Sequence, residues 1–392
     1  MKMTKRTLVF PLVNTLIFTA ALALGGCMSV PESREAAQVF PVFPPPPDEP
    51  RFIYERTLYS SADIVPDESS SKFKRLVTGE QVQGEGFAKP YGIAVHHGRV
   101  YVGDTARRGV MVFDIPGKRF FMIGEDDPGA LSLPLGLDVD RQGELYVADG
   151  SIKQVMVYNR DGKFLRAIGG ATWFHRPAGL AVDPDGHRVY VVDIGGVGTE
   201  EHRVRVFDAQ TGKHLSDFGK RGTEPGEFNL PRDVAVAPDG AVYVVDGGNF
   251  RVQKFRPDGT LIGVFGTIGR QSGQFSRPKE VAVDSAGNVY VVDTAFGNFQ
   301  IFSPQGQLLL AVGARSDKDG PAKYMLPSGI AVDGDGRVYA VDQYFRKVDI
   351  YRPADLPADG GFLGKKAPDK KGASEPGKDA INKQGKSTTT NP

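Results

Sequence analysis

Cysteine, net charge and long apolar runs are what this chain has least of. It holds a single cysteine, Cys27, among 392 residues. One thiol forms no intramolecular disulfide and no cysteine-based zinc site, so the fold must be held by its core alone. The 48 lysines and arginines nearly balance the 47 acidic residues and leave a net charge of +1. Such a balance gives no strong field to steer a highly charged partner such as a nucleic acid.

The one long apolar run, from Leu8 to Leu24, lies close to the start of the chain. It follows a basic start and precedes small residues, which is the pattern of a secretory signal over residues 1–26. The ending Leu24-Gly25-Gly26-Cys27 resembles the bacterial lipobox, and this resemblance implies that Cys27 is lipidated and becomes the mature N-terminus. An uncleaved membrane anchor is the alternative, but Pro11 and Asn14 interrupt a run that is short for a membrane-spanning helix.

An exported lipoprotein meets a restricted set of partners. Lipid on Cys27 would anchor the chain to a membrane. Met28 stands where an aspartate would be the usual signal for retention in the inner membrane, so we expect the outer membrane, facing the periplasm. The expected partners are an envelope protein, a peptide or a glycan, with no nucleic acid, and the chain is expected to be monomeric. Residues 27–50 are rich in proline and are predicted to form an extended linker behind the lipid.

Six repeats fill the chain between Phe73 and Arg352. Each opens on a Pro-x-x-[Ile/Leu/Val] pattern, at Pro90, Pro134, Pro177, Pro231, Pro278 and Pro327. A Tyr-x-x-Asp pattern follows, ending at Asp104, Asp149, Asp193, Asp246, Asp293 and Asp342. Short β-branched runs separated by turns such as Pro238-Asp239-Gly240 predict four strands per repeat. A period mostly in the forties with four strands is typical of a β-propeller, so residues 51–355 are predicted to be all-β, a six-bladed propeller of four-stranded antiparallel blades.

The fourth repeat carries the features of a known family. Its segment Asp246-Gly-Gly-Asn249-Phe-Arg251-Val-Gln-Lys-Phe255 resembles the core of an NHL repeat, and so does the connector from Phe218 to Pro231. The resemblance extends over all six units and is strongest in blades 4 and 5. It implies a six-bladed propeller and little about activity, because NHL propellers serve many functions. Since the Tyr-x-x-Asp pattern recurs in every blade, we expect a structural role for its aspartate and packing between blades for its tyrosine.

One strand is missing from the last repeat. The unit from Pro327 to Arg352 has three strands, whereas Phe73–Thr78 resembles a fourth strand without its first three. We therefore predict that Phe73–Thr78, an N-terminal strand, completes blade 6 and closes the ring, which removes exposed strand edges. Phe52–Tyr59 either adds an edge strand or packs beneath the ring. Residues 356–392 are rich in lysine, proline and glycine and are predicted to be a disordered basic tail.

Loops at one rim of a propeller form its usual site, and here that rim includes the residues around each opening proline. The candidates for binding a ligand or partner are Lys89, Tyr91, Trp173, His175, Arg176, Arg232, Asp233, Arg277, Lys279 and Glu280. Tryptophan and arginine are frequent anchors of interfaces. Asp233 and Glu280 either pair with Arg232 and Lys279 in salt bridges between blades or take part in binding a ligand.

Enzymes of similar shape suggest the alternative function. This chain resembles amidating lyases, which hold zinc with histidines from several blades, and lactonases, which use an acidic calcium site. The six histidines form no trio at equivalent positions of the repeats: His96, His97, His175, His187, His202 and His214. Calcium needs only oxygen ligands, so a site made by Asp138, Asp233 and Glu280 stays open. We therefore expect a binding or scaffolding module with no catalytic residue and no cofactor, calcium excepted. The alternative is a metal-dependent hydrolase or lyase, lactonase-like or amidating-lyase-like, with its site at the channel mouth.

Overall fold

The computed structural model describes residues 40–65, 84–196 and 198–364, all within one compact unit that begins at Phe40. The predicted signal segment, Cys27, the strand predicted at Phe73–Thr78 and the tail after Gly364 lie outside the described residues. None of the helices that the structure describes is long and apolar enough to cross a membrane.

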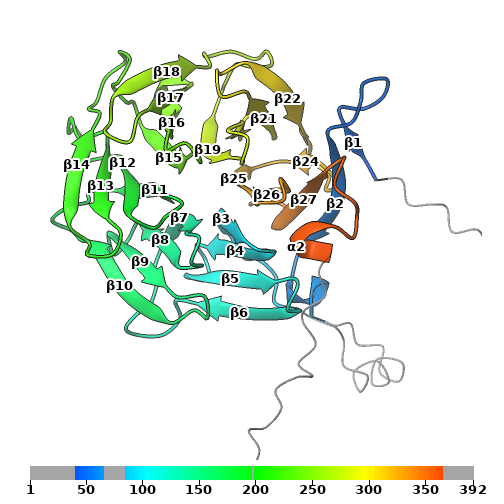
Figure 1. Cartoon of the computed structure of the whole chain (residues 1–392), viewed down its shortest axis with the longest axis horizontal. Coiled ribbons are helices and arrows are strands. Elements are labelled where there is room, and N and C mark those ends of the chain that lie inside the picture. Colours follow the sequence, from blue (N-terminus) through cyan, green and yellow to red (C-terminus); the bar gives the residue numbers. More distant parts are fainter. Residues whose placement is uncertain (1–39, 66–83, 197, 365–392) are drawn as a thin grey trace, which may run out of the picture. The chain divides into compact units, whose positions relative to one another are not determined.

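Six sheets surround a central axis, and each of the first five is built from four consecutive antiparallel strands (Figure 1). Blade 1 contains β3 (Pro90–His96), β4 (Arg99–Asp104), β5 (Gly109–Asp114) and β6 (Arg119–Ile123). Blade 2 contains β7 (Pro134–Val139), β8 (Leu145–Asp149), β9 (Gln154–Tyr158) and β10 (Phe164–Gly169). Blade 3 contains β11 (Pro177–Val182), β12 (Arg188–Asp193), β13 (Arg203–Asp208) and β14 (His214–Phe218). Blade 4 contains β15 (Pro231–Val236), β16 (Val242–Asp246), β17 (Arg251–Phe255) and β18 (Leu261–Phe265). Blade 5 contains β19 (Pro278–Val283), β20 (Val289–Asp293), β21 (Asn298–Phe302) and β22 (Leu308–Val312).

Smaller elements lie between and after the blades. They are the 3-10 turns η1 (Ser61–Asp63) and η2 (Gly247–Asn249), the short parallel pair β23 (Ala314–Arg315) and β24 (Lys323–Tyr324), and α2 (Gly361–Gly364). The turns of blade 4 form where the proline-aspartate-glycine trios predict them. Gly240 and Gly259 end these turns with φ of 83° and 87°, a left-handed conformation that favours glycine.

The sixth blade joins the two ends of the described chain. Its strands β25 (Pro327–Val332), β26 (Val338–Asp342) and β27 (Lys347–Pro353) are completed by β2 (Phe52–Leu58), which pairs with β27. The prediction of an N-terminal closing strand is confirmed, but the choice of Phe73–Thr78 was wrong, because Phe52–Leu58 occupies that place. β1 (Val42–Phe43) adds a fifth strand beside β2.

Both segments that flank the predicted propeller are partly folded onto it. Phe43, within the predicted proline-rich linker, packs edge-on against Tyr351 of β27 at a centroid distance of 5.7 Å. After β27, Leu363 packs against the core between blades 6 and 1, and the Phe362 ring lies 4.6 Å from that of His97. The described parts of the predicted linker, from Phe40, and of the predicted tail, up to Gly364, therefore belong to the folded unit.

The core lies between blades. Each Tyr-x-x-Asp tyrosine is buried among apolar residues of its own blade and the next, as Tyr101 is against Leu137 and Tyr146 is against Leu180. The innermost strands lie side by side in the order β3, β7, β11, β15, β19 and β25, and β25 again meets β3. The ring is thus closed at its axis as well as at blade 6, and the six opening prolines stand together around one end of the central channel.

Candidate functional site

The repeated aspartates hold the connectors that enter each blade. In blade 1 the Asp104 carboxylate accepts hydrogen bonds from the backbone N–H groups of Ala88 and Lys89, at 2.7 and 3.0 Å. Equivalent bonds to the residues before the opening proline are accepted by Asp149, Asp193, Asp246, Asp293 and Asp342. This arrangement agrees with the expected structural role of the aspartates, and it places the residue before each proline at the rim.

Five of the predicted rim residues form one cluster, which we call the mouth: Lys89, Tyr91, Arg232, Arg277 and Lys279. They come from blades 1, 4 and 5. The Lys279 ammonium of blade 5 lies 4.0 Å from the centre of the Tyr91 ring of blade 1, in a cation–π contact. Burial lowers the pKa of Lys279 to about 8; the negative charge of Glu280 opposes this change, whereas the positive charges of Arg232, Lys89 and Arg277 add to it.

The mouth cations form no ion pair with any residue that the structure describes. Within the described ranges, none of Lys89, Arg232, Arg277 and Lys279 takes part in an ion pair, although other arginines and lysines of the same ranges do. Lys89, Arg232 and Arg277 are exposed, and Lys279 is half-buried. The mouth therefore concentrates positive charge that the surrounding protein does not neutralise. Arg176, at the equivalent position of blade 3, is exposed as well and also lacks an ion pair among the described residues.

Beneath the mouth the innermost strands enclose a cavity of about 120 Å³ that contains three carboxyl groups. Each group accepts a hydrogen bond from the backbone of the next blade. Asp138 binds the Val182 N–H at 2.9 Å, Asp233 binds the Val281 N–H at 3.0 Å, and Glu280 binds the Ile330 N–H at 2.9 Å. These bonds tie blades 2 to 3, 4 to 5 and 5 to 6 at the axis.

Burial changes the chemistry of these carboxyls. It raises the pKa of Asp138 and of Asp233 to about 7, and the Asp138 charge adds to the effect on Asp233. It also raises the pKa of Glu280 well above its ordinary value, with a further contribution from the charge of Asp233. The same burial, together with the Glu280 charge, raises the pKa of Tyr91 to about 12. At neutral pH the channel beneath the mouth therefore carries less negative charge than three ordinary carboxylates would.

The predicted salt bridges of Asp233 and Glu280 with Arg232 and Lys279 do not form. Each acid instead binds a backbone N–H group of the next blade, Asp233 that of Val281 and Glu280 that of Ile330. In the described ranges, no group of three or more histidine, cysteine, aspartate or glutamate residues is placed to hold a metal ion. The calcium alternative stays a prediction.

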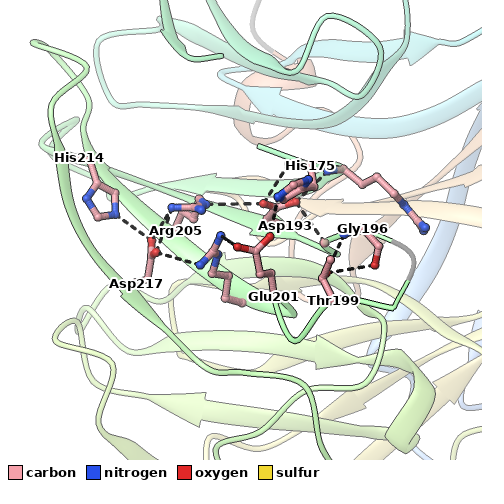
Figure 2. Close-up of polar contacts among 11 residues, drawn as sticks. His175, Asp193, Gly196, Thr199, Glu201, Arg205, His214 and Asp217 are labelled. Atoms are coloured by element: carbon pink, nitrogen blue, oxygen red, sulfur yellow. Dashed lines mark hydrogen bonds and ion pairs between the residues drawn. The ribbon is translucent and has the colours of Figure 1, made fainter. Parts of the chain in front are cut away.

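The remaining rim candidates, Trp173 and His175, contact other parts of blade 3. Trp173 lies against Phe207 and His214 of the outer strands, whereas His175 contacts Glu201 of the loop before β13 (Figure 2). His175 Nε2 lies 2.6 Å from Glu201 Oε2, and Arg203 Nη2 lies 2.9 Å from the other oxygen of Glu201. The Trp173 ring stacks on that of His214 at a centroid distance of 4.6 Å. These two candidates therefore belong to a separate surface, which the long loop after β12 helps to form.

That surface rests on residues that the sequence interpretation missed. Asp217 of β14 binds both Arg205 and His214, at 3.0 and 2.8 Å. Arg205 replaces the glutamine of blades 4 and 5, where Gln253 and Gln300 bind the backbone of the connector. Alignment of the repeats could have found this substitution. Three further histidines have other contacts: His96 and His97 contact each other, and His202 binds backbone atoms of the next connector.

Comparison with known families identifies the repeats. The NHL repeat family model matches residues 174–207 and 228–255. The chain contains NHL repeats. The matched ranges fall in blades 3 and 4, whereas the resemblance read from the sequence is strongest in blades 4 and 5.

The relatives of this NHL propeller are named as different kinds of protein. A probable peptidyl-alpha-hydroxyglycine alpha-amidating lyase of Caenorhabditis elegans is 34% identical over 28% of this chain and 31% of its own length. The protein brain tumor of Drosophila melanogaster is 34% identical over 41% of this chain and 16% of its own length. The chain thus spans less than a third of these relatives. Among solved structures, a gluconolactonase of Xanthomonas campestris shares the fold, with a TM-score of 0.52, 16% identity and coverage of 68% of this chain and 86% of its own.

Proposed function

We propose that this NHL propeller is a binding module whose site is the mouth of its central channel and whose partner carries negative charge. The observation that supports the proposal is the cluster of Lys89, Arg232, Arg277 and Lys279, none of which takes part in an ion pair among the described residues. Hydrogen bonds between such cations and a bound anion are charge-assisted, and a bound anion would also offset the repulsion among the cations. Positive potential around a concave opening also speeds the approach of an anionic partner.

The place of action belongs to the same proposal. The lipobox-like ending at Cys27 and the apolar run before it support export and attachment to the outer membrane by lipid. An envelope protein, a peptide or a glycan that bears acidic groups would meet the mouth there.

A hydrolase or lyase at the same mouth is the second candidate, and the amidating-lyase relative favours it. The histidines and carboxylates described above do not converge as ligands, so we derive no metal-dependent step. The similarity to the gluconolactonase supports the fold alone, because its identity is 16%.

The experiment measures binding of a fluorescein-labelled hexaglutamate peptide by polarisation. The protein is the mature chain, residues 27–392, with Cys27→Ser to prevent lipidation and oxidation. We expect the Arg232→Ala/Arg277→Ala variant to bind about tenfold more weakly, a loss of about 1.4 kcal/mol, and binding to weaken as salt is added.

The matched control is Lys213→Ala/Arg256→Ala, which removes two exposed cations from the turns between the third and fourth strands of blades 3 and 4. Its affinity should stay within about twofold of the starting protein. An equal loss in both variants would assign the binding to overall charge and exclude the mouth as the site. No binding by the starting protein would remove the proposal altogether.

A further inference from the structure

Around the mouth, cations alternate with leucines from blade to blade. The residue before the opening proline is, in blade order, Lys89, Leu133, Arg176, Leu230, Arg277 and Leu326. All six positions are equivalent, because the repeated aspartates or, for Leu230, the ring of His202 bind the backbone there. Three basic and three apolar side chains therefore share one rim.

Two of the three leucines of this rim are exposed, and Leu133 is half-buried. Leu230 is 38% exposed and Leu326 is 37% exposed. Leu230 is also held at φ 50°, in the left-handed region that a leucine rarely occupies. Contact between exposed apolar surface and water is unfavourable, so an apolar group that covered these leucines would be stabilised by the hydrophobic effect.

Two chemistries thus meet within one opening: unpaired cations at its centre and apolar side chains between the outer cations. We propose that the mouth binds a small amphiphilic anion, with one carboxylate on an apolar chain. The carboxylate lies against Lys279 and Arg232, and the apolar chain extends over Leu230 and Leu326. This inference rests on the proposed function, since it names the ligand class of the same site.

A flat anionic membrane fits this face less well than a small ligand does. The connector between blades 1 and 2 exposes Glu125, Asp126 and Asp127, and the connector between blades 3 and 4 exposes Glu224. These carboxylates would face the anionic lipid headgroups if the whole rim lay on a bilayer. A ligand that enters the opening meets only the central cations and the leucines.

Lys279 gives the site a dependence on pH. Its pKa is lowered to about 8, so the amine loses its charge as the pH rises through that value. The groups that act on it are Glu280, Arg232, Lys89 and Arg277, with the Tyr91 ring in contact. Affinity for a carboxylate that is ionised throughout should therefore fall between pH 7 and about 9.5. The substitution Lys279→Arg places a guanidinium there, which keeps its charge over that range and should remove most of the fall.

The test is calorimetric titration with decanoate below its micelle-forming concentration. Acetate serves as a probe for the carboxylate alone, and decanol as a probe for the apolar chain alone. Decanoate should bind more tightly than either. Leu230→Ala/Leu326→Ala should weaken decanoate about tenfold and leave the hexaglutamate peptide unchanged. The control Leu165→Ala/Leu215→Ala removes leucines that are 40% and 46% exposed on outer strands and should change neither affinity.

The outcomes separate this inference from the function on which it rests. One result is that hexaglutamate binds through the mouth while decanoate binds no more tightly than acetate, or while the affinity for decanoate does not change in the leucine variant. Either form of this result would overturn the proposal of an amphiphilic ligand and keep the proposal of an anionic partner. Failure of both probes would overturn both proposals. A third result is that the protein binds phosphatidylglycerol vesicles but not monomeric decanoate, and that the same leucine variant no longer binds the vesicles. That result would identify the mouth as a site for a lipid surface and overturn the proposal of a small ligand.

Discussion

Three carboxyl groups within the channel support the inner strands in an unusual way. Asp138, Asp233 and Glu280 reach across to the neighbouring blade and bind backbone N–H groups that the inner strands leave free at the axis. A buried carboxyl can accept such a bond whether or not it is ionised, but the charged form is penalised by desolvation. Desolvation therefore raises the pKa of all three carboxyls in the folded chain.

Asp233 should make the stability of the protein depend on pH. Its pKa of about 7 in the folded chain exceeds the value of about 4 for an unfolded aspartate, so the folded chain binds the proton more tightly. Stability is then greatest at low pH and falls as the pH rises from about 4 through about 7. Asp233→Asn keeps an oxygen acceptor for Val281 and cannot ionise. Calorimetry should show the melting temperature of this variant, relative to the starting protein, to be higher at pH 8 than at pH 5.

The control for this experiment is Asp126→Asn, at an exposed connector position. Each unit of difference in pKa corresponds to about 1.4 kcal/mol, so the change in relative stability is measurable. Parallel curves for the Asp233 variant and the starting protein would show that Asp233 does not titrate in this range.

The sequence predicts which residues surround the mouth better than it predicts their partners. Lys89, Tyr91, Arg232, Arg277 and Lys279 converge because the repeat places them at equivalent positions. The partners of Asp233 and Glu280 lie one blade away and are backbone atoms. A pattern of side chains carries no information about which backbone N–H groups remain free, so pairing with the adjacent basic residue was the wrong expectation.

The innermost strands approach one another so closely that four blades have glycine where blades 4 and 5 have these acids. A Cβ atom at Gly92 would lie 2.1 Å from the Leu135 carbonyl oxygen, and one at Gly136 would lie 2.7 Å from that of Ala178. The glycines therefore set the diameter of the channel, and their need is steric, because neither has a positive φ.

Gly92→Ala should destabilise the ring by about 1–3 kcal/mol, the usual cost of overpacking a closely packed site. The control is Gly263→Ala in the outer strand β18, where the nearest atom to an added Cβ is 3.7 Å away. Urea unfolding followed by fluorescence of the single tryptophan should show a lower midpoint for Gly92→Ala and no loss for the control. Equal midpoints would mean that the inner strands move apart without cost.

At the level of elements the repeat predicts the strands of the blades, and the wrong choice of the strand that completes blade 6 has a local cause. β2 contains a bulge between Tyr54 and Arg56, where the register with β27 shifts. A bulge breaks the alternation of buried and exposed residues by which a strand is read from sequence, and β2 also carries Glu55 and Arg56 at its centre. Phe73–Thr78, which copies the fourth strand of other repeats, was therefore the stronger candidate from sequence alone.

Across the whole molecule, one arginine joins three distant parts of the chain. Arg337 of blade 6 is fully buried, and its Nε donates to Glu55 of β2 at 2.8 Å. Its other nitrogens bind Asp335 and the backbone oxygen of Gly360. The N-terminal strand, the last blade and the segment after it are thus connected by a single side chain.

Arg337→Met should leave the nearly buried Glu55 charge with only the longer, 3.7 Å contact to the exposed Arg56 and cost about 3–5 kcal/mol. The control is Arg141→Met, which breaks an ion pair with Asp185 whose two side chains are 65% and 62% exposed, for about 0–1 kcal/mol. Urea unfolding measures both, and proteolysis should release the N-terminal strand sooner in Arg337→Met. If the two variants lose a similar amount of stability, the N-terminal strand and the segment at Gly360 stay attached to blade 6 without this arginine.

The pairing of β2 with β27 also dictates the order in which the protein is completed. Phe52 pairs with Pro353 and Leu58 pairs with Val348, so the ladder that closes blade 6 joins the beginning and the end of the synthesised domain. Five blades can assemble from neighbouring strands as the chain emerges, but the N-terminal strand must wait until nearly the whole domain has been made. Contacts of such long separation form slowly, and during that interval β2 has an unpaired edge that is open to other chains. The circular fold therefore has a vulnerable stage that a linear succession of repeats does not reveal.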